Sequence, residues 1–458
     1  RCYRQTAHAM AQPKNPNSSR SDHRPIRSDL VRAAVLEVYT ATRADGQLAD
    51  RALDRVLRRE TRLFSAERRA VGEAVFGMLR QERRIDRALF GREAPRADAS
   101  TFAARYAALL VLEGADPAQT ARAHGLPSAM AERLVRVREP LPSDLPPVEL
   151  VAIEGSLPDF IAERLVTDLG AEDALGFARS ISVRAPLTLR VNTLEIDRAG
   201  LERRLAREGL RTTPTRFSPL GLTVEERVNV FGLAAFKEGL FEVQDEGSQL
   251  LALVTGARPG ERIADTCAGA GGKTLALAAE MKNKGELWAM DVDPRRLEEL
   301  TKRARRAGVH NVRTRAIPAD QSADAALGKL AGKADRVLVD APCSGLGALR
   351  RGADSRYRFK PEDFSNYAAR QRELIARFAR LVRPGGRLVY ATCSVAREEN
   401  AAVVEAFLAS GAPFRVVPVA EALPPEARGA ASGPYLELLP HRHGTDGFFA
   451  AVLDRKST

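Results

Sequence analysis

The sequence predicts an α/β protein that ends in a doubly wound parallel sheet. Strand-like and helix-like segments alternate after residue 241, which is typical of a parallel sheet. A glycine-rich loop follows the first of these strands, and Cys343 and Cys393 each stand just after an apolar, strand-like run. Because a chain of 458 residues exceeds one ordinary hydrophobic core, we expect further domains before the sheet.

The N-terminal part is predicted to be helical. Residues 1–26 are polar, rich in Arg, Ser and Pro and almost free of acids, so we expect a disordered tail there. Over residues 27–140, apolar residues such as Val71 and Val75 recur at helical spacing, and strand signals are absent. A proline-rich linker over residues 139–147 ends this helical domain.

A small α+β subdomain is expected over residues 148–240, and the sheet domain over residues 241–458. In the subdomain, 187–192 and 221–224 resemble strands on either side of a basic helix. The strands expected in the sheet domain are 262–265, 287–291, 312–316, 336–340 and 387–391, with 414–419 and 448–453 closing the sheet.

Charge and cysteine content restrict the class of partner. The net charge of +12 favours a polyanion, with nucleic acid ahead of an acidic membrane surface. In the sequence, no apolar run reaches the roughly 20 residues that cross a bilayer, so we expect no membrane contact. The four cysteines have no metal-binding spacing, which predicts free thiols, no metal site and a reducing, cytoplasmic location.

Residues 265–274 form the predicted cofactor loop, because they follow the strand 262–265 and open a helix. Glycines there let the backbone approach a ligand closely, and the first N–H groups of the helix offer hydrogen bonds. Asp291 ends the next strand, about 20 residues beyond the loop, where an acid can hold both hydroxyls of a ribose. The sequence therefore predicts a cofactor that carries a nucleoside.

A P-loop-like NTPase is the first alternative. Lys273 and Thr274 end the loop as a phosphate-binding loop ends, and Asp340 stands where such enzymes hold magnesium. However, Cys267 occupies the position of the first glycine of that motif. Neither Asp291 nor a pair of thiols has a role in P-loop chemistry, so this interpretation ranks second.

The two cysteines that follow strands indicate covalent chemistry. Ligands of a doubly wound sheet bind outside the carboxyl ends of its strands, so Cys343 and Cys393 should face one pocket with Asp340. Two thiols and a carboxylate at one rim suit a reaction in which a bond to the enzyme is both made and broken. The residues alone do not distinguish which thiol attacks.

Four motifs together resemble the Nop/Sun family of RNA (cytosine-5) methyltransferases. They are 239–249, which reads GLFEVQDEGSQ, the two cysteine motifs 340–345 and 391–394 with Glu398, Glu399 and Asn400 beyond, and 446–449. The resemblance covers nearly everything after residue 26. It implies a Rossmann-like methyltransferase sheet at the C-terminus and a NusB-like RNA-binding domain over residues 27–140.

The resemblance also implies the cofactor, S-adenosylmethionine, the product, 5-methylcytosine, and the role of each site residue. Cys393 is implied to attack carbon 6 of cytosine, Cys343 to help release the product, and Asp340 to contact the base and the methionine end of the cofactor. Asp291 is implied to hold the ribose and Asp320 the adenine. The other cofactor-binding residues implied are Cys267, Ala268, Gly269, Ala270, Gly271, Gly272 and Lys273. Gly269-Ala270 replaces the family's usual Ala-Pro, which leaves the loop less constrained.

An RNA substrate is predicted by both the charge and the resemblance. The basic residues expected to contact RNA phosphates follow Cys343 and are Arg350, Arg351, Arg356 and Arg358. Tyr357 and Phe359 among them could stack on a base or pack in the core. The resemblance implies small-subunit (16S) ribosomal RNA as the substrate of a monomeric enzyme. An RNA-binding ribosome-assembly factor without catalysis is the remaining alternative.

Overall fold

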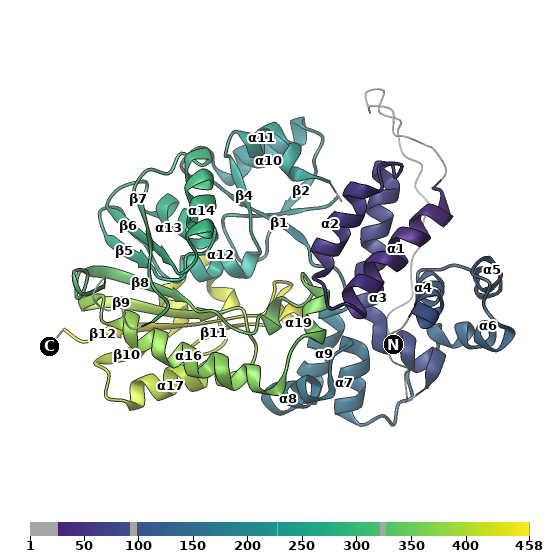
Figure 1. Ribbon diagram of the computed structural model, residues 1–458. Coiled ribbons are helices and arrows are strands. Elements are labelled where there is room, and N and C mark those ends of the chain that lie inside the picture. The colour runs from purple at the N-terminus through teal and green to yellow at the C-terminus, as the bar shows by residue number, and fades with distance from the viewer. Residues whose placement is uncertain (1–25, 92–98, 227, 321–326, 458) are drawn as a thin grey trace. The chain divides into compact units, whose positions relative to one another are not determined.

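The computed structural model describes residues 26–91, 99–226, 228–320 and 327–457. It consists of two compact units, Arg1–Val75 and Phe76–Thr458, and the division falls inside the long helix α3 (Ser65–Phe90) (Figure 1). The tail expected over residues 1–26 lies outside the described residues except for Ile26. Boundaries expected near residues 140 and 240 do not coincide with this division, and the four-part organisation stays a prediction.

The first unit is helical, as expected. It contains α1 (Ser28–Arg43), α2 (Ala49–Arg59) and the first part of α3. Its core is formed by apolar side chains that recur at helical spacing and are fully buried or nearly so: Val35, Val38, Ala52, Val56 and Val71. The helices are therefore amphipathic elements that bury one face each.

The second unit begins with more helices. They are the end of α3, α4 (Ala99–Leu112), α5 (Pro117–Ala123), α6 (Ser128–Val135), α7 (Pro147–Gly155), α8 (Asp159–Leu169) and α9 (Ala171–Ile181). The sequence prediction contained no helices in the range of α7 to α9. These three helices share a buried cluster with side chains that follow the two thiols in sequence, among them Leu346 and Val395.

A small antiparallel sheet follows α9 and has the strand order β2-β3-β1-β4. The strands are β1 (Leu187–Val191), β2 (Thr212–Pro214), β3 (Gly221–Val224) and β4 (Phe241–Val243), and the helices are α10 (Arg198–Arg207) and α11 (Ala234–Lys237). β1 and β3 confirm the two strands expected here, and α10 packs on the sheet through Leu201 and Leu205. The shorter β2 and β4 were not predicted.

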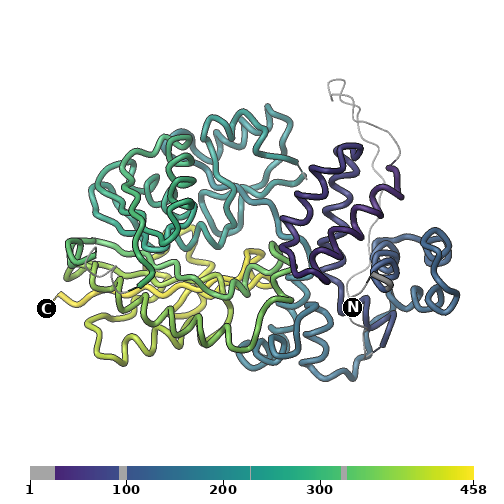
Figure 2. The backbone as a smooth tube through the Cα atoms, in the orientation of Figure 1, coloured from purple at the N-terminus to yellow at the C-terminus, as the bar shows by residue number. Residues whose placement is uncertain are grey.

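The large sheet has the order β10-β12-β9-β8-β5-β6-β7, with β11 beside β12. Its strands are β5 (Arg262–Asp265), β6 (Glu286–Asp291), β7 (Val312–Ala316), β8 (Ala334–Asp340), β9 (Val382–Thr392), β10 (Phe414–Val417), β11 (Leu436–Leu438) and β12 (Phe448–Arg455). β5 to β9 are parallel, and β10 to β12 pair antiparallel. In Figure 2 the yellow C-terminal strand runs among the green strands of this sheet.

Helices cover both faces of the large sheet, which confirms the doubly wound fold. They are α12 (Glu246–Leu253), α13 (Gly272–Glu280), α14 (Pro294–Arg306), α16 (Pro361–Ala379), α17 (Ala401–Ala409) and α18 (Val419–Ala422), whereas the short α19 (Pro440–His443) contacts α9. Side chains of α12, α13 and α14 share one buried cluster with the sheet, and those of α16 and α17 share another. Alternate residues of β6, β8, β9 and β12 face the two clusters, as the pleat requires.

The strand order changes direction at β5, because β6 and β7 lie on one side of it and β8 and β9 on the other. Such a switch point opens a crevice at the carboxyl ends of the strands. The register places Asp340 of β8 beside Ala391 of β9, so the loops that carry the two thiols leave the sheet next to each other. Within the described residues, none of the helices has the length and apolar character needed to cross a bilayer.

Candidate active site

The two cysteines meet at the carboxyl end of the sheet. Cys343 lies in the loop after β8 and Cys393 directly after β9. Their Sγ atoms are 3.4 Å apart, a distance at which one thiol donates a hydrogen bond to the other sulfur. Both side chains are partly exposed and neither forms a disulfide. The structure thus brings together the pair that the sequence placed at one rim.

The hydrogen bond makes the two thiols chemically unequal. Donation from Cys343 lowers the pKa of Cys393, against burial and the charge of Asp340, and Lys273 lowers it further. The same contact, together with burial, raises the pKa of Cys343 well above its usual range. Cys393 is therefore the thiol that ionises more readily, and Cys343 is the one that keeps its proton and donates to it.

Lys273 and Asp340 form an ion pair next to the thiols. The Nζ atom of Lys273 lies 2.6 Å from Oδ2 of Asp340, and the lysine side chain is largely buried. Burial opposes the ammonium, yet Asp340 outweighs it and raises the pKa of Lys273. Lys273 was expected to bind the cofactor, and in the structure it balances the carboxylate at the rim.

The predicted cofactor loop forms a cradle at the start of α13. Gly269 and Gly271 adopt left-handed backbone conformations, with φ of 54° and 88°. Asp291 accepts hydrogen bonds from the N–H groups of Gly269, at 2.8 Å, and Asp293, at 2.9 Å. The side chain of Asp291, the acid expected to hold a ribose, is therefore already oriented against the loop. A Cβ atom at Gly269 would have no other atom within 4 Å, so the space beside this glycine is open.

Asp265 lies beneath this cradle with one oxygen unsatisfied. Its Oδ2 accepts a hydrogen bond from Thr274 at 2.7 Å, while Oδ1 has no hydrogen-bond partner among the described residues. Burial raises the pKa of Asp265 to about 7. A buried oxygen without a donor at the carboxyl end of β5 suits a ligand that brings a hydrogen-bond donor.

Two arginines that sequence reasoning missed support the cofactor loop from outside. Arg190 of β1 is buried and donates to the carbonyl of Gly272 at 2.6 Å, and burial lowers its pKa to about 10. Arg303 of α14 donates to the carbonyl of Ala270 at 2.7 Å. These two hydrogen bonds fix the loop around Gly269-Ala270, where the family's usual proline is absent. Their donors are distant in sequence, so no local pattern could have revealed them.

The expected RNA contacts of Arg350 and Arg356 are corrected by the structure. Arg356 is fully buried and donates to the carbonyls of Gly155, Ile181 and Leu349. Arg350 is 4% exposed and forms an ion pair with Asp446. Neither guanidinium is accessible to a phosphate, because each satisfies acceptors inside the protein.

The other members of the basic run are more exposed. Arg351 binds Asp446 and also Asp245, at 2.8 Å, while Arg358 pairs with Asp354. Their side chains are 37% and 40% exposed, so an RNA contact for Arg351 and Arg358 stays a prediction.

The aromatic residues of this run pack inward. The hydroxyl of Tyr357 donates to the carbonyl of Leu79 at 2.8 Å. Phe359 packs against the cluster formed by α7, α8 and α9. Of the two roles considered for these rings, the structure shows packing.

Two further predicted cofactor residues occupy different environments. Cys267 packs against a core cluster, and burial raises its pKa far above the usual range, so it is a neutral thiol. Asp320 is exposed in the segment after β7, and its contact with adenine stays a prediction. In the described part of the chain, no group of three or more His, Cys, Asp or Glu side chains could hold a metal ion.

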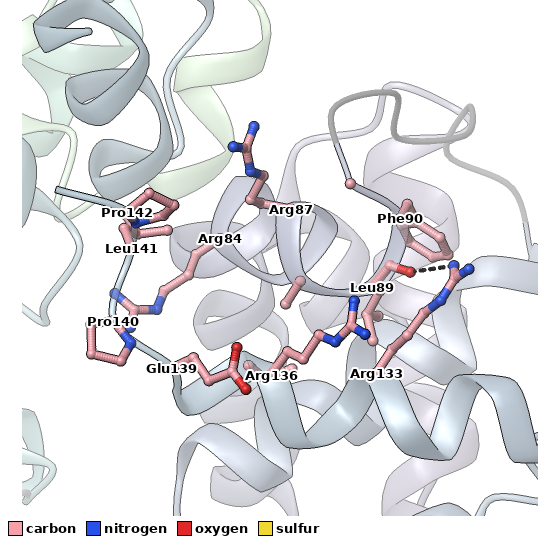
Figure 3. A pocket seen from close by; sticks show the side chains of 13 residues that line it. Arg84, Arg87, Leu89, Phe90, Arg133, Arg136, Glu139, Pro140, Leu141 and Pro142 are labelled. Atoms are coloured by element: carbon pink, nitrogen blue, oxygen red, sulfur yellow. Dashed lines mark hydrogen bonds between the residues drawn. The ribbon is translucent and has the colours of Figure 1, made fainter. Parts of the chain in front are cut away.

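An arginine-rich cavity of about 430 Å³ lies elsewhere in the second unit (Figure 3). Arg84, Arg87, Arg133 and Arg136 line it, with the linker 140–142 on one side. Arg133 donates to the carbonyl of Leu89 in the last turn of α3, at 2.8 Å. Basic side chains at helix C-termini balance the helix dipole, which accounts for this cluster without a ligand. The cavity shares no lining residue with the thiol site.

Open parallel sheets of this order, with a glycine loop after the first strand and an acid after the second, are the fold of Rossmann-like methyltransferases. Residues 252–454 match the family described as 16S rRNA methyltransferase RsmB/F, and residues 157–231 match the ferredoxin-like domain of RsmF/B-like methyltransferases. The chain belongs to the RsmB/F methyltransferase family. The resemblance to Nop/Sun enzymes is thereby confirmed.

Individual relatives agree with this assignment. The chain is 30% identical to the probable ribosomal RNA small subunit methyltransferase B of Synechocystis sp., over 89% of this chain and 95% of that protein. It superimposes on the crystal structure of PH0851 with a TM-score of 0.72 and 27% identity, covering 92% of this chain and 98% of that one. NSun6 from Pyrococcus horikoshii, solved with SFG, shares the fold at 23% identity and a TM-score of 0.58, covering 66% of this chain and 99% of that one.

Proposed function

We propose that this protein uses S-adenosylmethionine to form 5-methylcytosine in small-subunit ribosomal RNA. The observation that carries the proposal is the pair of sulfur atoms, 3.4 Å apart, of which Cys393 favours the thiolate and Cys343 the thiol. Relatives named as ribosomal RNA small subunit methyltransferases support the substrate.

Carbon 5 of cytosine is a poor nucleophile, and a thiolate overcomes this by adding at carbon 6. The new bond between Cys393 Sγ and carbon 6 makes carbon 5 enamine-like. Asp340, on the same rim, is assigned to the N3 edge of the base, where a hydrogen bond or a proton withdraws electrons as the sulfur adds. Its carboxylate is held for this contact by Lys273.

The residues of the cradle fit S-adenosylmethionine. Gly269 leaves open space for the ligand, Asp291 is assigned to the ribose, and Oδ1 of Asp265 has no hydrogen-bond partner among the described residues. When bound, this cofactor supplies an electrophilic methyl group. Asp320 is assigned to the adenine on the basis of the family resemblance.

Release of the product requires the carbon–sulfur bond to break. Solvent water takes the proton from carbon 5, the electrons of that carbon–hydrogen bond form the carbon 5–carbon 6 double bond, and the carbon 6–sulfur bond breaks and expels Cys393 as a thiolate. Cys343 lies at hydrogen-bond distance from the departing sulfur and can donate to it. This donation stabilises the leaving thiolate and accounts for the need for a second thiol.

The target cytosine must be unpaired or turned out of its helix, because both faces of the ring are used. Tyr357 and Phe359, which pack inward, are not assigned to stacking on this base. Arg351 and Arg358 are assigned to phosphate contact, since their side chains are partly exposed.

The P-loop interpretation is disfavoured by the position of its lysine. In P-loop enzymes the lysine reaches the phosphates and the acid holds magnesium. Here Lys273 and Asp340 bind each other at 2.6 Å, and two thiols adjoin them. The same pair serves the proposed chemistry directly.

A methyl-transfer assay tests the proposal. The full chain is incubated with methyl-labelled S-adenosylmethionine and small-subunit ribosomal RNA that lacks modification, and the nucleosides are separated after digestion. We expect label in 5-methylcytosine at a single position of the RNA. Binding of this RNA without methyl transfer would instead identify an assembly factor, and label in another nucleoside would refute the proposed chemistry.

A further inference from the structure

A buried carboxylate lies behind the two thiols. Glu399 ends the short helix η5 (Arg397–Glu399) and is 0% exposed. Its Oε2 accepts hydrogen bonds from the backbone N–H of Ser344, at 2.8 Å, and from the side-chain amide of Gln371, at 3.1 Å. Its Oε1 accepts from the hydroxyls of Ser344, at 2.5 Å, and Ser394, at 2.7 Å.

The two serines are the direct neighbours of the two cysteines. Ser344 follows Cys343 and Ser394 follows Cys393. Their hydroxyl oxygens are 3.2 Å apart and converge on the same carboxylate oxygen. One carboxylate therefore joins the loop after β8 to the loop after β9 at the positions that bear the sulfurs. A backbone hydrogen bond from the N–H of Gly347 to the carbonyl of Cys393, at 3.0 Å, adds a second link.

The donor set explains how this buried position accommodates a carboxylate. Among the described residues, four hydrogen bonds from neutral donors reach the two oxygens of the Glu399 side chain. A buried charge is costly unless hydrogen bonds replace its hydration. The four hydrogen bonds replace the hydration of the Glu399 carboxylate. This side chain is therefore an internal hydrogen-bond acceptor and not a solvated surface acid.

We propose that Glu399 is a positioning residue of the thiol pair, which sets the separation of the two sulfur atoms by binding the serine beside each cysteine. The inference rests on the proposed function, because it matters only if both thiols act on one base. Glu399 does not touch the substrate in this account. It acts through Ser344 and Ser394.

The charge of Glu399 assists in keeping one thiol protonated. The hydrogen bond to Cys393 and burial raise the pKa of Cys343, and the Glu399 carboxylate raises it further. Asp340 and Glu399 also raise the pKa of Cys393, whereas Lys273 and the hydrogen bond from Cys343 lower it. A second ionisation of the pair is therefore disfavoured, which preserves the donor that the departing sulfur needs.

Oxidation of the thiol pair measures the sulfur separation without any RNA. Diamide converts two adjacent thiols to a disulfide by taking up two electrons and two protons. We expect rapid formation of the Cys343–Cys393 disulfide in the natural protein, mapped by peptide mass spectrometry. Glu399→Ala should slow it by about tenfold or more, since small misplacements of reacting atoms cost large factors in rate.

Conservative variants separate positioning from folding. Glu399→Gln keeps an oxygen for the two N–H donors, and its amide can face the hydroxyls, which are free to rotate, so most of the oxidation rate should return. Ser344→Ala and Ser394→Ala each remove one hydroxyl and should give intermediate rates. Asn192→Ala is the matched control, because Asn192 is also buried and its side chain donates to two carbonyls outside the thiol loops.

The two serines should also differ in their effect on the reaction with RNA. Ser344→Ala loosens the thiol assigned to release and should increase the fraction of protein trapped as an RNA adduct. Ser394→Ala loosens the attacking thiol and should slow methyl transfer without accumulating adduct.

The outcomes distinguish the inference from the function on which it rests. Oxidation of Glu399→Ala at the natural rate would overturn the positioning role, whatever the activity of the protein. A natural protein that forms no disulfide would contradict the sulfur separation itself. Conversely, slow oxidation of Glu399→Ala together with absent methyl transfer by the natural protein would leave the positioning role standing and refute the proposed function.

Discussion

The ammonium of Lys273 and the carboxylate of Asp340 lie 2.6 Å apart and join the helix after the cofactor loop to the strand that leads to Cys343. This pair places a positive charge near Cys393, whose pKa it helps to lower. One ion pair thus links the helix that follows the glycine-rich loop to the loop that carries Cys343.

Lys273→Met should raise the pKa of Cys393. The substitution removes a charge that favours the thiolate and leaves that of Asp340, which disfavours it, so alkylation by iodoacetamide should require higher pH. We expect a shift of up to about one pH unit in the profile of Cys393 modification. Lys302→Met, on the exposed face of α14, should leave the profile unchanged. An unaltered profile in Lys273→Met would show that the ion pair does not act on the thiols.

Substitution of the two loop glycines should have unequal effects. Gly271→Ala would place Cβ 2.5 Å from Cγ of Leu300 and also impose a left-handed backbone on alanine. Gly269→Ala meets nothing within 4 Å, so its cost is the backbone strain of about 1–2 kcal/mol. Calorimetric titration with S-adenosylmethionine and thermal unfolding should both show greater loss for Gly271→Ala. Equal losses would mean that packing against Leu300 does not shape the cradle.

Arg356→Ala should destabilise the fold without changing how RNA binding depends on salt. It leaves the carbonyls of Gly155, Ile181 and Leu349 without their donor, which should cost about 3 kcal/mol of unfolding free energy in urea titrations. Arg358→Ala, at a partly exposed ion pair, should cost less than about 1 kcal/mol. A reduced salt slope with unchanged stability would restore the phosphate contact expected from the sequence.

The stability of the protein should depend on the protonation of Asp265. Burial raises its pKa to about 7, so the native state binds this proton more tightly than the unfolded chain. The stabilisation is complete below about pH 4, the ordinary range of an aspartate, and is lost as the pH rises to about 7. Asp265→Asn should remove this loss, which amounts to at most about 4 kcal/mol. Unfolding free energies of both proteins at pH 5 and pH 8 test the sign: a natural protein that gains stability relative to the variant on going to pH 8 would contradict it.

The parts of the fold that the sequence predicted are those with local signals. β5 and β7 begin and end where apolar periodicity and turn residues placed them, and Cys343 and Cys393 follow their strands as expected. The strands β2, β4 and β11 were not predicted, because three residues are too few to show an alternating pattern.

The missed features depend on residues far apart in the chain. An arginine in a basic run looks exposed, and only the carbonyls of Gly155 and Ile181 show why Arg356 is buried. The support of the cofactor loop by Arg190 and Arg303 is equally non-local. Glu399 stood within a recognised motif, but its use required both serines to be located in space. The sequence therefore predicted the reactive residues more reliably than it predicted which charged residues are buried and support the fold.

The central claim is that two thiols act in turn on one cytosine. Its most direct test is denaturing electrophoresis of the protein with labelled small-subunit ribosomal RNA and S-adenosylmethionine, comparing Cys343→Ala with Cys393→Ala. We predict that Cys343→Ala accumulates a covalent protein–RNA adduct, whereas Cys393→Ala forms neither adduct nor 5-methylcytosine. An adduct that accumulates in Cys393→Ala instead, or full turnover in either variant, would contradict the account.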